Sequence, residues 1–194
     1  MTKKSKIAFI VVDLQNDFCP GGALPVADGD KIVPLVNIQV ARARRAGHVV
    51  AASRDWHPRQ TKHFKEFGGI WPVHCVQGTR GAEFHPDFDI RDIPVFSKGT
   101  GTEDDGYSAY DGRSESGQTL LEFLQEKEVE EVCLKGLATD YCVKATALDA
   151  RKHGFKTVVL LDACRAVNLH PDDEAKAIKE MRDAGVLFSS VWVG

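Results

Sequence analysis

Apolar residues occur along this chain mainly as short continuous runs, separated by longer segments in which they recur with a helical period. The runs are rich in β-branched residues, which is typical of strands buried on both faces of a parallel sheet. We expect strands at residues 7–12, 48–53, 93–96, 129–134, 155–161 and 186–193. We expect helices between them at residues 30–46, 116–127, 142–151 and 171–185. This alternation predicts an α/β fold with a mainly parallel sheet covered on both faces.

Chemically active side chains lie at or just past the ends of four of these strands: Asp13, Asp55, Lys98 and Cys142. The carboxyl ends of parallel strands gather at one edge of a sheet, where open α/β sheets bind their ligands. We therefore expect the four side chains to converge. Each also has an ordinary alternative, namely a turn-capping aspartate, a solvated surface lysine or a small buried cysteine.

Cys142 lies in a segment whose pattern predicts a strand, a tight turn and a helix. Thr139 or Asp140 can cap this helix, which places Cys142 in its first turn. Unpaired N–H groups and the helix dipole favour an anion there, and thus a thiolate. The N–H groups of the turn could also bind the oxyanion formed when a thiolate attacks a carbonyl. Taken alone, this stretch slightly favours a cysteine that only packs the helix against the sheet.

A candidate metal site follows the second strand, in Arg54-Asp55-Trp56-His57-Pro58. Pro58 favours an extended conformation at His57, so Asp55 and His57 should point the same way. His63 and His74 come soon after, although His63, in a polar stretch, could instead face water. One carboxylate with two or three imidazoles suits zinc, iron or manganese.

Composition limits the classes of partner and compartment. With 194 residues and 43% hydrophobic content, the chain can form one domain over residues 1–194. Its net charge of −3 gives no general attraction to nucleic acid or to an anionic membrane. The first apolar run is too short for a signal peptide or a membrane span. Five cysteines without a CxxC pair fit reduced thiols in a cytoplasmic protein. The sequence does not determine whether the protein forms a homo-oligomer.

Five segments in this order resemble the nicotinamidase (pyrazinamidase) family of the isochorismatase-like cysteine hydrolases. They are V-D-L-Q-N-D-F around Asp13, R-D-W-H-P, W-P-V-H-C, F-S-K-G around Lys98, and G-L-A-T-D-Y-C-V around Cys142. The resemblance spans residues 7 to about 164. It implies a single-domain, three-layer α/β/α fold with a parallel sheet of about six strands.

The resemblance also implies the roles of individual residues. Asp13, Lys98 and Cys142 fall on the catalytic set, and the N–H groups of Ala138 and Cys142 on the oxyanion hole. The metal ligands fall on Asp55, His57 and His74, with His63 as a fourth ligand found in some members only. The substrate-binding positions fall on Phe18, Leu24, Trp71, Tyr107 and Leu137, and a cis peptide on Leu137-Ala138.

The resemblance implies a metal-dependent amidohydrolase that converts nicotinamide to nicotinate and ammonia in NAD salvage, and that also cleaves pyrazinamide. Its cofactor would be one divalent transition metal, with zinc first and iron or manganese as alternatives. Family relatives that cleave isochorismate lack the cysteine, so Cys142 argues against that activity. Two rival functions stay open: an amidohydrolase for carbamoyl or ureido compounds with the same Asp, Lys and Cys, and a non-catalytic metal-binding or redox-responsive module.

Overall fold

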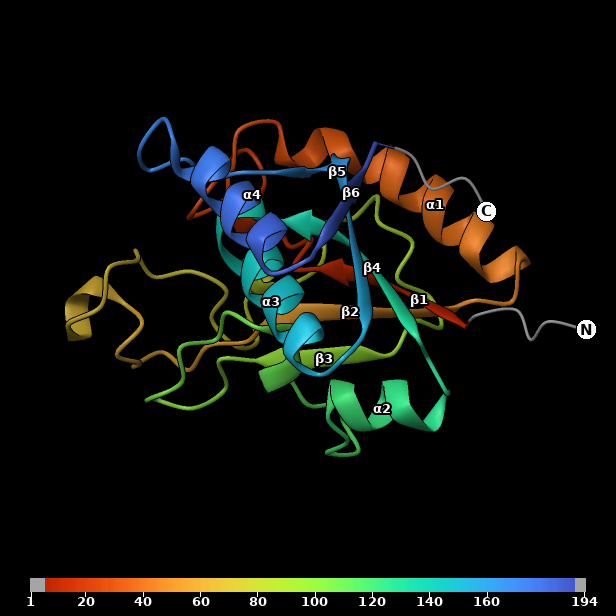
Figure 1. Ribbon diagram of the computed structural model, residues 1–194. Coiled ribbons are helices and arrows are strands. Elements are labelled where there is room, and N and C mark those ends of the chain that lie inside the picture. Colours follow the sequence, from red (N-terminus) through yellow and green to blue (C-terminus); the bar gives the residue numbers. More distant parts are fainter. Residues whose placement is uncertain (1–5, 191–194) are drawn as a thin grey trace, which may run out of the picture.

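The predicted α/β fold is confirmed by a computed structural model, which describes residues 6–190 (Figure 1). Its strands form one all-parallel sheet in the order β3-β2-β1-β4-β5-β6. They are β1 (Ile7–Val12), β2 (Val49–Asp55), β3 (Val95–Lys98), β4 (Glu131–Leu137), β5 (Lys156–Arg165) and β6 (Leu187–Ser189). The end of the last predicted strand, residues 191–193, lies outside the described residues.

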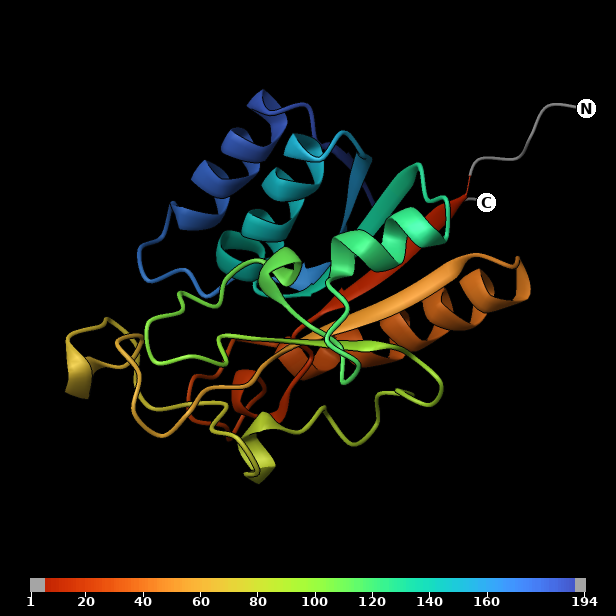
Figure 2. The same cartoon turned by 90° about the horizontal axis from the view of Figure 1, so that it is seen from below.

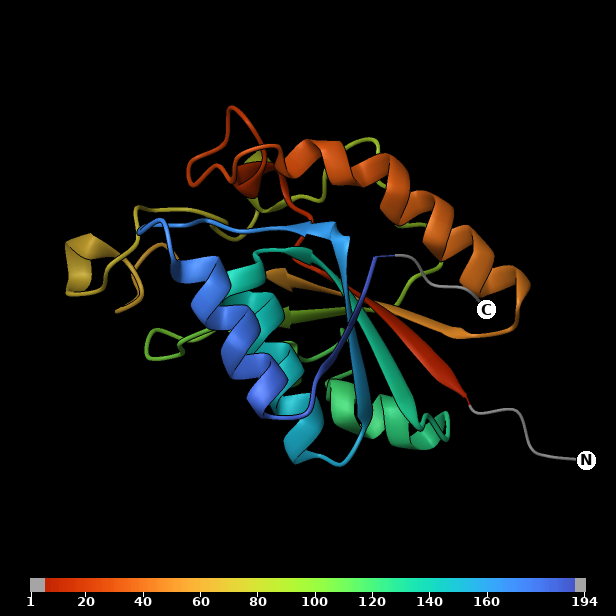
Figure 3. The same ribbon diagram turned by 45° about the horizontal axis from the view of Figure 1, so that its top comes forward.

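Helices cover both faces of this sheet, giving the three expected layers (Figures 2 and 3). One face carries α1 (Val33–Arg45), and the other carries α2 (Leu120–Glu126), α3 (Lys144–Lys152) and α4 (Asp173–Asp183). The central strand β1 contributes to both interfaces because successive side chains point to opposite faces. Phe9 and Val11 join the core under α1, whereas Ala8, Ile10 and Val12 join the core under the other helices.

Several element boundaries differ from the predicted ones for local reasons. Asp30 lies inside a 3₁₀ turn, Gly29–Ile32, and does not cap α1. Helix α2 begins later than expected because Thr119 and Glu122 form a capping box, which satisfies free N–H groups at its start. Strand β3 continues to Lys98, so this lysine ends the strand instead of following it.

The strand order reverses between β1 and β4, the point where open parallel sheets form a ligand crevice at their carboxyl ends. Gly136 permits the close approach of β4 to β1 there. It has a φ of 122°, and an added Cβ would lie 2.0 Å from the carbonyl oxygen of Val12. The long connection from β2 to β3, residues 56–94, extends beyond this edge of the sheet (Figure 2).

Two further expectations concern the cysteines and the membrane. All five cysteines are free thiols, and all five are buried. Within residues 6–190, none of the helices has the length and apolar character needed to cross a bilayer.

Candidate active site

Asp13, Lys98 and Cys142 meet at the carboxyl edge of the sheet, as their positions after different strands predicted. Lys98 is the central member: its Nζ lies 2.8 Å from Oδ2 of Asp13 and 3.4 Å from Sγ of Cys142. Asp13 follows β1 directly and has a left-handed φ of 46°, a strained conformation for a residue with a side chain. All three side chains are almost completely removed from solvent.

The turn that carries Cys142 differs from the predicted one. Cys142 lies in a π-helical turn, Thr139–Val143, and the α-helix α3 begins only at Lys144. The N–H of Val143 bonds the carbonyl of Ala138, which closes the turn. The peptide between Leu137 and Ala138 is cis, as the family resemblance implied.

Burial determines the protonation state of Cys142. It raises the pKa of the Cys142 thiol well above its usual range, and the opposing effect of Lys98 does not reverse this. Cys142 is therefore a thiol at neutral pH. Burial also raises the pKa of Asp13 despite the neighbouring ammonium of Lys98, so its carboxylate has an increased affinity for a proton.

Lys98 connects Asp13 and Cys142 to Asp55. Its Nζ pairs with Oδ1 of Asp55 and also donates to the carbonyl of Gly106. Burial opposes its charge, but Asp13 and Asp55 outweigh burial and hold the Lys98 pKa well above its usual range. Burial likewise opposes ionisation of Asp55, but Lys98 and nearby imidazoles hold the Asp55 pKa well below its usual range. Lys98 is thus an ammonium shared by two carboxylates.

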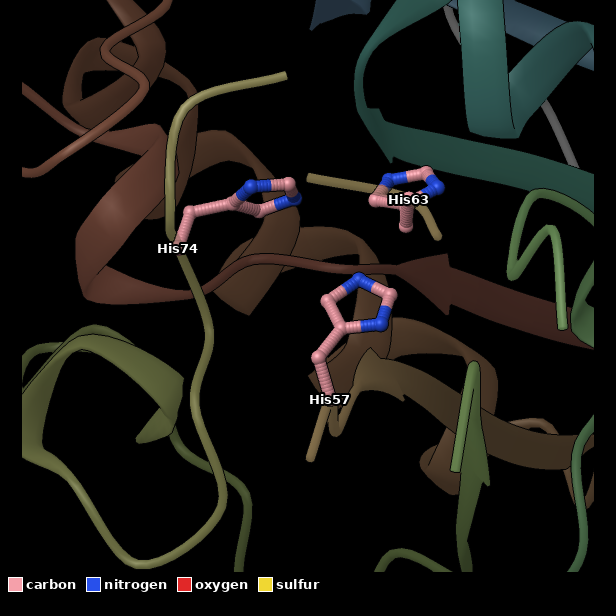
Figure 4. Close-up of side chains that lie close together, drawn as sticks. All are labelled: His57, His63 and His74. Carbon is pink, nitrogen blue, oxygen red and sulfur yellow. The ribbon is translucent and has the colours of Figure 1, made fainter. Parts of the chain in front are cut away.

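Three histidines, His57, His63 and His74, face one another (Figure 4). One ring nitrogen from each of His57, His63 and His74 lies within 4.8 Å of the others. The Nδ1 atoms of His57 and His74 lie 3.0 and 2.8 Å from the carbonyl oxygens of Gly99 and Pro72. These contacts fix the proton on Nδ1 and leave Nε2 free to bind a metal.

The donor set fits a divalent transition metal. Nε2 of His57 is buried without a hydrogen-bond partner among the described residues. Oδ2 of Asp55 lies 3.5 Å from Nε2 of His57 and 3.8 Å from Nε2 of His74. Burial and the neighbouring His57 lower the pKa of His63 to about 3, so its imidazole is neutral, the form that ligates metals. His63 is half-buried and lies with the other two histidines.

A small cavity of about 30 Å³ lies between Cys142 and the histidines His63 and His74, all three of which line it. The Trp71 indole donates to Oη of Tyr107 at 2.9 Å, and Tyr141 packs edge to face against Trp71 at 4.7 Å. The cavity is lined by Phe18, Leu24, Asp55, His63, Trp71, His74, Tyr107, Ala138, Tyr141, Cys142 and Val167. It therefore presents aromatic walls next to both the thiol and the histidines.

Most of the predicted substrate-binding residues line this cavity, with one exception. Leu137 is buried in the core under α1 and does not line the cavity, because the strand directs its side chain into the sheet interface. Sequence reasoning missed Tyr141 and Val167. Tyr141 precedes Cys142 inside the recognised motif and was available as a candidate. Val167 follows β5 and carries no local signal.

Comparison with known proteins agrees with this geometry. Residues 7–191 match the Isochorismatase domain family. The chain is 42% identical to the nicotinamidase of Escherichia coli strain K12 over 195 residues, with 92% of each chain covered. It is 44% identical to the pyrazinamidase of Pyrococcus horikoshii, solved in complex with zinc, with a TM-score of 0.85 and coverage of 95% and 98%. For PnC1 of L. infantum, solved with nicotinate, the identity is 34%, the TM-score 0.84 and the coverage 95% and 92%.

Proposed function

The chain belongs to the isochorismatase family and, within it, to the nicotinamidases and pyrazinamidases, and on this premise we propose its reaction and the residues that perform it. The protein hydrolyses the carboxamide C–N bond of nicotinamide, giving nicotinate and ammonia, a step of NAD salvage. Pyrazinamide is a second substrate. One observation carries the proposal: Cys142, His63 and His74 border the same aromatic cavity.

The first half of the reaction forms a thioester. An oxygen of Asp13 lies within 4.8 Å of the Cys142 sulfur, and this carboxylate accepts the thiol proton. Lys98 stabilises the charges on both groups. The thiolate attacks the carboxamide carbon, and the N–H groups of Ala138 and Cys142 bind the resulting oxyanion. Asp13 then returns its proton to the amide nitrogen, the C–N bond breaks and ammonia leaves.

The second half of the reaction restores the enzyme. Asp13, again a carboxylate, accepts a proton from a water molecule that attacks the thioester carbonyl. The C–S bond breaks, Asp13 returns the proton to the sulfur of Cys142, and nicotinic acid leaves and ionises to nicotinate in solvent. The raised pKa of Asp13 suits both halves, because a carboxylate with higher proton affinity is a more effective general base near neutral pH.

We further propose that Asp55, His57, His63 and His74 bind zinc. When bound, the metal supplies a Lewis acid to which the pyridine nitrogen of the substrate can coordinate. Phe18 and Trp71 flank the ring, so that the amide is held toward Cys142. The protein thus separates orientation of the substrate from supply of the nucleophile.

The test is ammonia release from nicotinamide by the purified protein and by Cys142→Ala, with metal analysis of both. We expect release by the wild type only and the same metal content in both samples, because Cys142 supplies the nucleophile and no metal ligand. Loss of metal in Cys142→Ala would contradict this division of roles. Metal-loaded wild type that releases no ammonia from nicotinamide, but does from a carbamoyl or ureido compound, would favour the rival amidohydrolase.

A further inference from the structure

Asp55 occupies a position where its strand loses its neighbour. Strands β1 and β2 pair as far as Val12 and Ser53, and the last backbone bond runs from the N–H of Asp13 to the carbonyl of Ser53 at 3.2 Å. The left-handed conformation of Asp13 then turns the chain away from β2. The N–H and C=O of Asp55 therefore have no strand to pair with on this side, although buried backbone groups require partners.

The side chain of Gln15 replaces the missing strand. Its Oε1 accepts from the N–H of Asp55 at 2.8 Å, and its Nε2 donates to the C=O of Asp55 at 2.8 Å. The same Nε2 donates to the carbonyl of Ala82 at 2.9 Å. Gln15 is completely buried. One side-chain amide thus binds Asp55 as a peptide group of β1 would, and also connects it to the segment after β2.

The two hydrogen bonds from Gln15 fix Asp55, whose carboxylate contacts both Lys98 and the histidines. On the other side of β2, Asp55 pairs in register with Lys98, and the next N–H, of Trp56, bonds the carbonyl of Lys98 at 3.0 Å. With the backbone held on both sides, the Asp55 carboxylate can direct Oδ1 to Lys98 and Oδ2 to the histidines. We propose that Gln15 is a positioning residue that sets the metal affinity of this site through the backbone of Asp55.

Asp17, two residues later, holds the other side of the metal site in a similar way. Its Oδ2 accepts from the N–H of Cys75 at 2.7 Å, and Cys75 directly follows His74. The carbonyl of Cys75 in turn accepts from the N–H of His57 at 3.0 Å. Gln15 and Asp17 thereby connect one short loop to the backbone around Asp55, His57 and His74. Outer contacts of this kind change metal affinity by about 10- to 100-fold.

The inference rests on the metal site of the proposed function but not on its substrate, so the test measures metal binding directly. Zn²⁺ affinity is determined by competition with a chromogenic chelator, and Co²⁺ absorption reports the ligand geometry. Gln15→Met keeps the length of the side chain and removes its hydrogen bonds. The matched control is Asn37→Leu, because the Asn37 amide also bonds two backbone groups of a loop, at Asp87 and Asp89, outside the site.

We expect Gln15→Met to bind Zn²⁺ about 10- to 100-fold more weakly, to change the Co²⁺ spectrum, and to recover ammonia release as Zn²⁺ is raised. Asn37→Leu should retain wild-type Zn²⁺ affinity and activity. If Gln15→Met does not fold, Gln15→Glu tests the same point, because it cannot donate to Asp55 or Ala82.

A folded Gln15 variant with wild-type Zn²⁺ affinity would overturn the inference, and so would failure of both variants to fold, which would make Gln15 a folding residue. Wild type that binds no Zn²⁺ or Co²⁺ would also overturn it. Wild type that binds Zn²⁺ but leaves nicotinamide intact would contradict only the proposed function.

Discussion

Two lysines are completely buried in the same sheet, in opposite surroundings. Lys98 ends β3 and is paired with Asp13 and Asp55, which hold its pKa well above its usual range. Lys135 lies within β4, and its Nζ has no hydrogen-bond partner among the described residues. It lies 4.3 Å from the ring centre of Phe9, and burial lowers the pKa of Lys135 to about 7.

The difference shows how a position in the sheet decides the state of a buried charge. At the carboxyl edge, side chains from several strand ends converge, so an ammonium finds carboxylates that offset its loss of hydration. Within a strand, a lysine faces the core layer, and the titratable groups that raise the Lys135 pKa there are the thiols of Cys133 and Cys164, which do not offset burial. Lys98 is therefore held charged, whereas Lys135 is largely neutral above pH 7.

The largest effect is expected when Lys98, the charged one of the two buried lysines, is replaced. Lys98→Met should lower kcat for ammonia release by about 100- to 1000-fold, because no preorganised cation then stabilises the charges on Asp13 and Cys142. Steady-state kinetics of folded protein, verified by circular dichroism, measures this. Lys135→Met should keep the wild-type kcat. Equal loss of kcat in both variants would contradict the distinction between a lysine that acts in the reaction and one that does not.

A second expectation concerns how stability depends on pH. An unfolded lysine titrates near 10.4, about three units above Lys135 in the folded protein, so between pH 7 and 10 the unfolded state binds more protons. The free energy of unfolding should therefore rise with pH over this window, by up to about 4 kcal/mol from Lys135 alone. Below pH 7 the lysine is protonated in both states and contributes no slope.

Urea unfolding of wild type and Lys135→Met at several pH values isolates this contribution, because other titrating groups are common to both proteins. Lys135→Met should be the more stable protein at pH 7, and its advantage should shrink toward pH 10. Parallel curves for the two proteins would show that Lys135 titrates normally in the folded state.

The smallest effect is expected at a lysine in the same sheet that is exposed to water. Lys156 begins β5, its side chain is 60% exposed, and its Nζ lies 2.6 Å from Glu131. Exposed ion pairs contribute about 0–1 kcal/mol, so Lys156→Met should change the free energy of unfolding by no more than that. The kcat and the pH slope should stay as in wild type. A larger loss of stability would mean that burial is not what distinguishes the three lysines.

Local sequence determined the elements and the candidates for chemistry. Buried strands reveal themselves as continuous apolar runs, and the residues that follow them, such as Asp13 and Cys142, are readable without any long-range information. The five motifs then identified the family, which the comparisons confirm. Element ends were less predictable, since side-chain caps such as that of Thr119 and the π-helical turn around Cys142 depend on detailed backbone geometry.

Only the tertiary structure decided which ionisable groups interact and which side chains line the cavity. The pKa of Cys142 is raised by burial, which the position of a cysteine in a turn does not reveal. Val167 reaches the cavity, and Leu137 does not, because the directions of side chains depend on how distant segments pack. The contrast between Lys98 and Lys135 has the same cause. Electrostatic energy depends on distances in space, so two lysines that are each followed by a glycine in sequence acquire different charges once the sheet has formed.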